Sequence, residues 1–267
     1  MRPVYPVTNE KPDPLAIRLC TALHDVPTTR RAACCSHSPG LSLASECART
    51  LSAALHDNAV TMDAAAVDAC VSAMEKNHEG CDWVGPTGAP LPAVCDGLIK
   101  GTIVEGKRCR SSLECQNSFR CVGVGPTDAG VCRKPLPNNY PCAVAVDTLA
   151  ALTRQDSFEK EHPECNGYCA QRRCRDFAPL GGECKTAIEC GAGKICAHKK
   201  CEEGALPGLG KPCLDSACAA GLRCEKGICA GPKEEGAACK NDIECKGGCV
   251  RGDGGKEGSC GMKCRML

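Results

Sequence analysis

Cysteine is the residue type with the most potential chemistry in this chain, because 28 of the 267 residues are cysteine. Cysteines form disulfides, ligate metals as thiolates or take part in redox reactions. Structural zinc sites and most iron–sulfur or haem attachments use Cys-x-x-Cys pairs, and this sequence has none. Such a cysteine density is typical of disulfide scaffolds, which persist in oxidising compartments. We therefore expect disulfides, with no metal and no cofactor.

The other candidate residues are isolated. His37, in the stretch "CCSHS", is the histidine best placed near thiols, and a metal or redox role there is one alternative. The stretch "RGD", formed by Arg251, Gly252 and Asp253, lies in a Gly-rich loop between two cysteines and is a possible binding loop. The sequence has no nucleophile elbow and no phosphate-binding Gly-rich loop, so we expect no enzymatic activity.

The charge balance and hydropathy exclude two classes of partner. Thirty-three Lys and Arg against 32 Asp and Glu give a net charge of +1, which argues against nucleic-acid binding. No stretch approaches the ~18 apolar residues of a membrane span.

The first residues, "MRPVYPVTNEKPDP", lack the apolar core of a signal peptide. We expect that a signal peptide has been removed and that the protein is secreted, periplasmic or on the cell surface.

Helical periodicity extends from about residue 13 to residue 77. Asp13 and Pro14 are a favourable N-cap and N1 pair, and we expect Pro27 to end this first helix. "TTRRAACC", residues 28–35, predicts a separate short helix. Two longer helices should follow, one with Cys47, Leu51, Ala54 and Leu55 on its apolar face, and one opened by Thr61, with Asp63 in its first turn and Val67, Cys70, Val71 and Met74 on its apolar face.

After Cys95 a cysteine repeat replaces the helical pattern. Its clear copies are "GKRCRSSLECQNSFRCVGVGPTDAGVC", "GGECKTAIECGAGKICAHKKC", "GKPCLDSACAAGLRCEKGIC" and "GAACKNDIECKGGCVRGDGGKEGSC". A Gly precedes the first cysteine by three positions, and Glu114, Glu189 and Glu244 each precede a second cysteine. A disguised fifth copy contains "PECNGYC", with Glu164 in the same place and an insertion over residues 143–162 that predicts a short helix and a site for specific function.

These patterns predict a small disulfide-rich fold: an α-helical, disulfide-pinned N-terminal domain followed by an array of short cysteine-rich β-hairpin repeats. We expect an extended segment over 1–12, the helical domain over 13–105, and repeats over 106–134, 135–178, 179–205, 206–231 and 232–267, the last including the tail. A unit of about 25 residues cannot bury enough apolar surface to offset its ordering entropy. Disulfides must therefore take the place of a core.

Four cysteines per repeat permit three pairings, and sequence alone does not choose among them. We favour first-to-third with second-to-fourth, because sequential pairing would close very small loops. The favoured pairs are Cys109–Cys121, Cys115–Cys132, Cys142–Cys169, Cys165–Cys174, Cys184–Cys196, Cys190–Cys201, Cys213–Cys224, Cys218–Cys229, Cys239–Cys249 and Cys245–Cys260.

Eight cysteines remain after the repeats are closed: Cys20, Cys34, Cys35, Cys47, Cys70, Cys81, Cys95 and Cys264. Seven of them lie in the helical region, and seven is an odd number. We therefore consider a bridge from Cys264 to the helical bundle. Two free thiols, an intermolecular bridge or an exchange between repeats are the alternatives.

The motifs "CRSSLECQNSFRC", "CKTAIECGAGKIC", "CLDSACAAGLRC" and "CKNDIEC" resemble the Dickkopf N-terminal-type cysteine-rich repeat, and more loosely the EB and colipase-like modules. The resemblance covers roughly Gly106 to Cys264, and the whole chain looks like predicted secreted or lipid-anchored bacterial proteins with this domain. It implies small disulfide-linked hairpins and interlocked pairing. The receptor binding of the animal proteins belongs to domains and loops that have no match here.

The expected function is that of a secreted or cell-surface, non-catalytic binding or scaffold protein that presents loops to an extracellular protein or glycan. One alternative is a secreted inhibitor or toxin-like effector of a protease or receptor. The other is a metal or redox protein that uses thiols and histidine.

Overall fold

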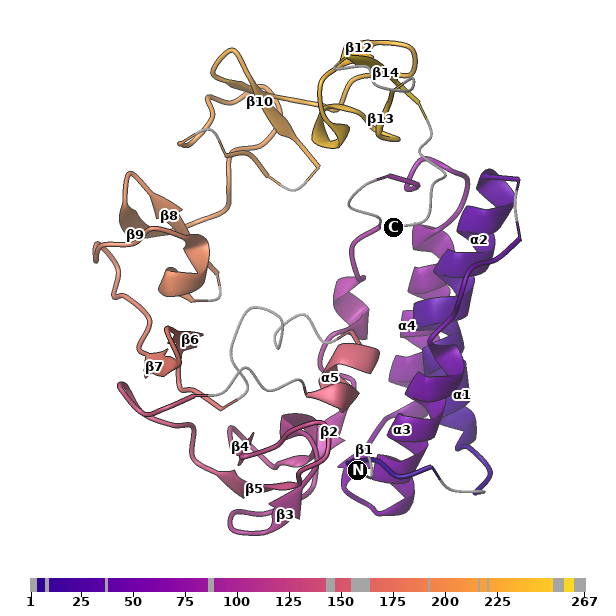
Figure 1. Cartoon of the computed structure of the whole chain (residues 1–267), viewed down its shortest axis with the longest axis vertical. Coiled ribbons are helices and arrows are strands. Elements are labelled where there is room, and N and C mark those ends of the chain that lie inside the picture. Colours follow the sequence, from indigo (N-terminus) through magenta and orange to yellow (C-terminus); the bar gives the residue numbers. More distant parts are fainter. Residues whose placement is uncertain are drawn as a thin grey trace. The chain divides into compact units, whose positions relative to one another are not determined.

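The computed structural model describes residues 4–7, 10–36, 38–85, 89–142, 147–154, 164–191, 193–215, 217–219, 221–251 and 257–261. The chain forms two compact units. One comprises Met1–Val26, Ser42–Lys76 and Leu91–Phe177, and the other comprises Pro27–Leu41, Asn77–Pro90 and Ala178–Leu267. Helices dominate the first part of the chain and short hairpins the remainder, which is the expected fold class (Figure 1).

Acidic side chains cap the first and the last of the long helices. In front of α1 (Pro14–Cys20), Asp13 Oδ1 accepts the backbone N–H of Leu15 at 2.8 Å. Asp63 has the same role before α4 (Ala64–Asn77), since its Oδ1 accepts the N–H of Ala66 at 2.8 Å. Asp63 thus precedes α4 instead of lying in its first turn. Thr61 belongs to β1 (Val60–Thr61), which pairs with β2 (Lys100–Gly101).

The prediction that Pro27 ends the first helix is wrong. The helix continues from α1 through a π-helical turn, η1 (Thr21–Asp25), into α2 (Val26–Cys34), which includes most of the predicted separate helix over residues 28–35. Within the π turn, the N–H of Val26 donates to Thr21 O. A proline ring normally clashes with the carbonyl four residues earlier. The wider π turn directly before Pro27 gives the ring room.

The helices of the first unit surround an apolar core. The faces of α1, α4 and α3 (Ala44–His56) contribute Leu19, Leu51, Val67 and Met74, none more than 1 % exposed. Disulfides Cys20–Cys47 and Cys70–Cys95 join α1 to α3 and α4 to the short helix η2 (Ala93–Cys95). Among the described residues, no helix is both long enough and apolar enough to cross a bilayer.

The insertion in the second repeat packs into this same core. It forms α5 (Thr148–Leu152), whose Leu149 and Ala150 are buried within the core of the first unit. Asp147 caps α5 through the N–H of Ala150 at 3.1 Å and also accepts the N–H of Ser112 in the first repeat at 2.8 Å. In its described part, the insertion therefore docks the first two repeats onto the helices.

The repeats have two sheet types, which follow the gap between the third and fourth cysteines. The second, third and fourth repeats have four residues in that gap and form the two-stranded hairpins β6–β7 (Tyr168–Ala170, Arg173–Arg175), β8–β9 (Lys194–Ala197, Lys200–Glu203) and β10–β11 (Arg223–Glu225, Ile228–Ala230). The first and last repeats have ten and form three-stranded sheets, ordered β3-β5-β4 (Arg108–Cys109, Gly130–Arg133, Arg120–Val122) and β12-β14-β13 (Ala238–Cys239, Gly258–Cys260, Cys249–Val250). Short 3-10 helices η3 (Ser112–Glu114), η4 (Ala187–Cys190) and η5 (Asp242–Glu244) connect first and second cysteines.

The residue three positions before each first cysteine has a defined role. Its backbone N–H donates to the carbonyl of the fourth cysteine, which closes the repeat. These bonds are Gly106 to Cys132, Asn139 to Cys174, Gly181 to Cys201, Gly210 to Cys229 and Gly236 to Cys260, at 2.7–2.9 Å. All five donors have a positive φ, between 68° and 83°, a conformation that Gly and then Asn adopt most readily. The backbone conformation thus explains both the Gly pattern and the Asn of the disguised copy.

Candidate functional site

Each repeat is organised around two disulfides that cross. The third and fourth cysteines are register partners across a hairpin, for example Cys196 and Cys201, yet they bond to the first and second instead. The observed pairs are Cys109–Cys121, Cys115–Cys132, Cys142–Cys169, Cys165–Cys174, Cys184–Cys196, Cys190–Cys201, Cys213–Cys224, Cys218–Cys229, Cys239–Cys249 and Cys245–Cys260. This is the interlocked order.

The sulfur atoms of each repeat are crowded but oxidised. In the third repeat the Sγ atoms of Cys184, Cys190 and Cys196 lie within 4.8 Å of one another, and every other repeat has a comparable trio. A cysteine binds a metal ion as its thiolate. All described cysteines are in disulfides. In this state the sulfurs supply packing: the third repeat's buried cluster consists of Cys184, Cys190 and Cys201, with Ala178 and Cys196 against it.

The N-terminal cysteines pair mostly among themselves. Besides the two bridges of the helical core, Cys34 bonds to Cys81 in the second unit. Cys35 is also disulfide-bonded. Cys264 lies outside the described residues, so the predicted tail-to-bundle bridge stays a prediction.

The glutamate in front of the second cysteine is a backbone acceptor. In three repeats its carboxylate reaches back four positions to the N–H that follows the first cysteine: Glu114 to Arg110 at 2.6 Å, Glu189 to Lys185 at 2.8 Å and Glu244 to Lys240 at 3.2 Å. This resembles the capping-box arrangement at a helix start. Glu164 accepts the N–H of Gly123 at 2.7 Å instead and links the second repeat to the first.

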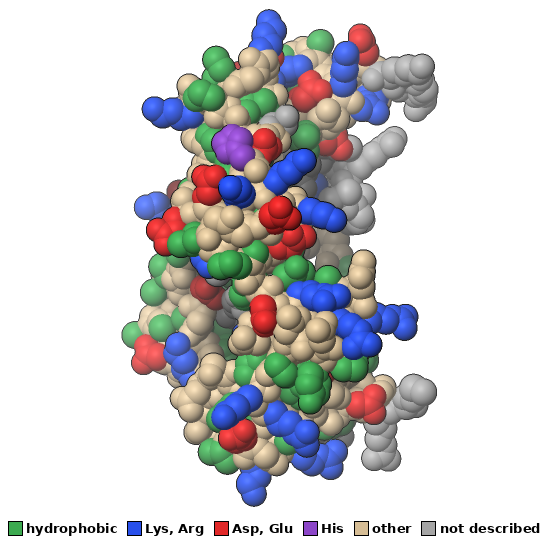
Figure 2. Space-filling view, turned by 90° about the vertical axis from the view of Figure 1, so that its left-hand side faces the viewer, with side chains coloured by type: hydrophobic (Ala, Val, Ile, Leu, Met, Phe, Trp, Pro, Cys, Tyr) green, Lys and Arg blue, Asp and Glu red, His purple; other side chains and the backbone are tan. Residues whose placement is uncertain are grey.

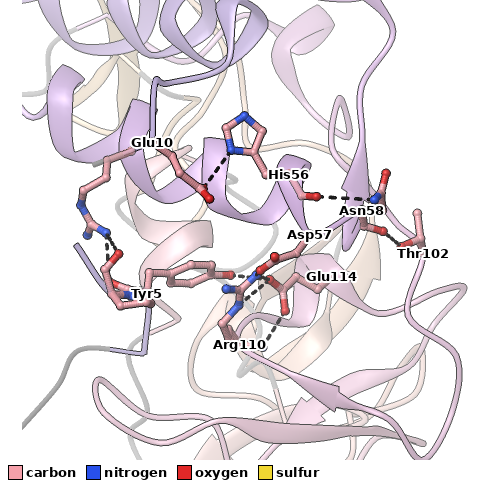
Figure 3. A network of polar contacts seen from close by, with 10 residues as sticks. Tyr5, Glu10, His56, Asp57, Asn58, Thr102, Arg110 and Glu114 are labelled. Carbon is pink, nitrogen blue, oxygen red and sulfur yellow. Dashed lines mark hydrogen bonds and ion pairs between the residues drawn. The ribbon is translucent and has the colours of Figure 1, made fainter. Parts of the chain in front are cut away.

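A polar network surrounds Glu114 at the start of the first repeat. The Tyr5 hydroxyl donates to Glu114 Oε1 at 2.9 Å, and the Arg110 guanidinium lies 3.2 Å from the same atom and 2.8 Å from Asp57 Oδ2 (Figure 3). Arg110 also stacks over the Tyr5 ring at 4.6 Å. Burial, reinforced by the carboxylates of Glu114 and Asp147, raises the pKa of the Tyr5 phenol above its ordinary value. Tyr5 thus stays protonated as a hydrogen-bond donor, and it anchors the N-terminal segment.

A surface pocket of about 390 Å³ adjoins this network. Val4, Asp57, Arg108, Arg110 and Glu114 are among its lining residues. The carboxylate of Glu114 is 1 % exposed and saturated by the contacts above. Asp57 is already paired with Arg110, so Arg108 is the remaining charged side chain of the described lining, and the network itself is structural.

The hairpin tips of the middle repeats carry exposed polar and basic side chains. Their central turn pairs are Gln171–Arg172, His198–Lys199 and Lys226–Gly227, with φ values from 49° to 84°. Such two-residue turns favour Asn-Gly, because a positive φ costs other residues about 1–2 kcal/mol each. The turns instead carry long side chains, five of the six residues being other than Gly.

The two residue groups selected earlier for binding or redox chemistry are only partly within the described chain. Arg251 is exposed, and its guanidinium donates to the carbonyl of Lys240. Gly252, Asp253 and His37 lie outside the described residues. The structure therefore tests neither the predicted RGD binding loop nor the metal or redox role of His37.

Comparisons with protein families, with curated proteins and with solved structures find no match to this chain. The relationship of its repeats to the Dickkopf-type module remains a hypothesis.

Proposed function

We propose that this chain is a secreted or cell-surface, non-catalytic binding protein whose disulfide-stapled repeats present loops to an extracellular macromolecule. One observation carries the proposal: the repeats pack around their own disulfides and leave the hairpin tips exposed. A loop on a rigid support loses little conformational entropy on binding. The crossed disulfides supply that support, and they fit an oxidising compartment.

The tips also argue for binding. Lys, Arg and His at left-handed turn positions make the hairpins less stable than Asn-Gly would. Residues that lower local stability are commonly retained where they contact a partner. In the proposed role, the described part of the insertion has a structural task, since α5 fixes the second repeat to the helical core.

A binding screen tests this proposal. The disulfide-intact chain is screened in solution against purified extracellular proteins and glycans, with reduced and alkylated chain as the control. The expected result is saturable binding to a discrete partner that is lost on reduction. Absence of any binding, titratable thiols with stoichiometric metal, or turnover of a substrate would each overturn the proposal.

A further inference from the structure

The third and fourth repeats, which belong to the same compact unit, enclose a groove of about 860 Å³. Ile195, Leu206 and Leu214 form a partly buried aliphatic floor, and Lys185 and Lys199 are exposed on the lining. Over the face seen in Figure 2, hydrophobic, basic and acidic side chains are interspersed among the described residues, without a broad area of a single kind. Among its described residues, this face therefore presents no broad apolar or single-charge interaction surface.

One charged contact fixes the groove. The backbone N–H of His198, at the β8–β9 tip, donates to Asp215 Oδ2 of the fourth repeat at 2.7 Å. His198, Lys199 and Asp215 all line the groove, and all have a positive φ, of 51°, 62° and 47°. Eleven described non-glycine residues have this conformation, and three of them meet here. Strained backbone of this kind is concentrated at ligand-binding sites.

The charges around the groove define the complementary ligand. Lys185 and Lys199 are exposed cations, whereas Asp215, the one carboxylate in the described lining, already accepts the His198 N–H. Sugars and nucleobases are commonly held by stacking on aromatic rings, and the described lining contains no Phe, Tyr or Trp. A ligand with an aliphatic side chain flanked by carboxylates would match both the aliphatic floor and the two exposed lysines.

We propose that this groove binds an acidic peptide segment of a partner protein. In this proposal an aliphatic side chain occupies the floor of Ile195, Leu206 and Leu214, and neighbouring carboxylates pair with Lys185 and Lys199. The assignment rests on the proposed binding function and adds the site and the chemical class of its ligand.

The test uses the full-length, disulfide-intact chain and three fluorescein-labelled hexapeptides, DLDELD, DSDESD and KLKKLK, with fluorescence anisotropy as the readout. Saturable binding of DLDELD is expected. The peptide without leucines and the basic peptide should bind at least about tenfold more weakly, since each loses one of the two complementary features. Binding of DLDELD should also weaken with added salt.

Charge-reversal variants localise the binding. The double substitution Lys185→Glu and Lys199→Glu should weaken DLDELD binding by at least about tenfold, because it turns attraction into repulsion. Lys200→Glu is the control, because Lys200 is exposed on the same hairpin but does not line the groove. The affinity of this variant for DLDELD should stay within about twofold of that of the unsubstituted chain. All three lysines are exposed, and circular dichroism checks that the variants fold.

Failure to bind DLDELD, or equal losses in the double variant and in Lys200→Glu, would overturn the groove assignment. A partner from the binding screen that still binds the double variant with unchanged affinity would overturn the groove alone and leave the binding function standing. A chain that binds neither the peptide nor any partner would refute both proposals.

Discussion

Replacing Cys184 and Cys196 by alanine is expected to unfold the third repeat and leave the helical core folded. The two cysteines are 12 residues apart, and the chain-entropy model assigns a loop of that length about 3 kcal/mol. Apart from cysteines, the described residues of this repeat bury little apolar surface: Ala178 packs against the cysteine cluster, Ala197 is 0 % exposed and Ile195 is only partly buried. Burying an alanine side chain contributes about 1 kcal/mol or less, which does not offset the loss.

A matched control removes a disulfide that has a larger entropic effect. Cys20 and Cys47 are 27 residues apart, so their bridge is worth about 3.5 kcal/mol in the same model. This bridge lies in a core that also buries Leu19, Leu51 and Met74. We therefore expect the Cys20→Ala/Cys47→Ala variant to lose stability but remain folded. If loop length alone set the loss of stability, the Cys20→Ala/Cys47→Ala variant would be the more destabilised of the two.

Amide hydrogen exchange read by mass spectrometry separates the two outcomes. Peptides covering residues 194–203 should lose protection in the Cys184→Ala/Cys196→Ala variant, whereas peptides from α3 keep it. In the control variant, α3 should stay protected. A third repeat that keeps native protection without its bridge would refute the reasoning that disulfides replace its core.

Three further predictions follow from individual contacts. Tyr5→Phe removes a buried hydrogen bond to the Glu114 carboxylate and should lower the free energy of unfolding by about 2 kcal/mol, measured by chemical denaturation. The same loss in a Glu114→Ala background, which has no side-chain acceptor for the phenol, would show that the bond is not its source. Burial lowers the pKa of His24 below its ordinary value, so the folded state binds fewer protons than the unfolded state and stability should fall as the pH drops from about 7 to about 5. His24→Gln should flatten that part of the melting-temperature profile, and an unchanged slope would contradict the assignment. Gly181→Ala should lower the stability of the third repeat by about 1 kcal/mol, while Gly181→Asn should be tolerated better, as Asn139 is in the second repeat; equal losses by hydrogen exchange would refute a conformational cause.

Local patterns in the sequence predicted most of the fold. The Asp13 cap, the apolar faces of the helices and the five cysteine quartets each depend on residues close in sequence, and periodicity reports such features well. The prediction that Pro27 ends the helix was wrong because the helix continues through a π turn before Pro27, and no local sequence pattern predicts that turn. The burial of Tyr5 was also missed, since it depends on contacts with Arg110 and Glu114 more than a hundred residues away.

The candidate binding groove was beyond sequence analysis for a different reason. The groove joins residues of two repeats, and the spacing within each repeat does not predict how the neighbouring repeat packs. The recurring glutamates are visible in the sequence, but their role as backbone acceptors depends on the turn between the first two cysteines of each repeat. The one available signal was the basic tip of the β8–β9 hairpin, where His198 and Lys199 stand in place of the favoured Asn-Gly.

The intact mass of the non-reduced chain, with and without thiol alkylation, tests most directly whether the cysteines are the structural core. If all 28 cysteines are paired, each loses one hydrogen, and the mass should lie about 28 Da below that of the reduced chain, with no alkylation. Several alkylated thiols, or a metal retained in stoichiometric amount on the same sample, would contradict this and identify the cysteines as reactive groups.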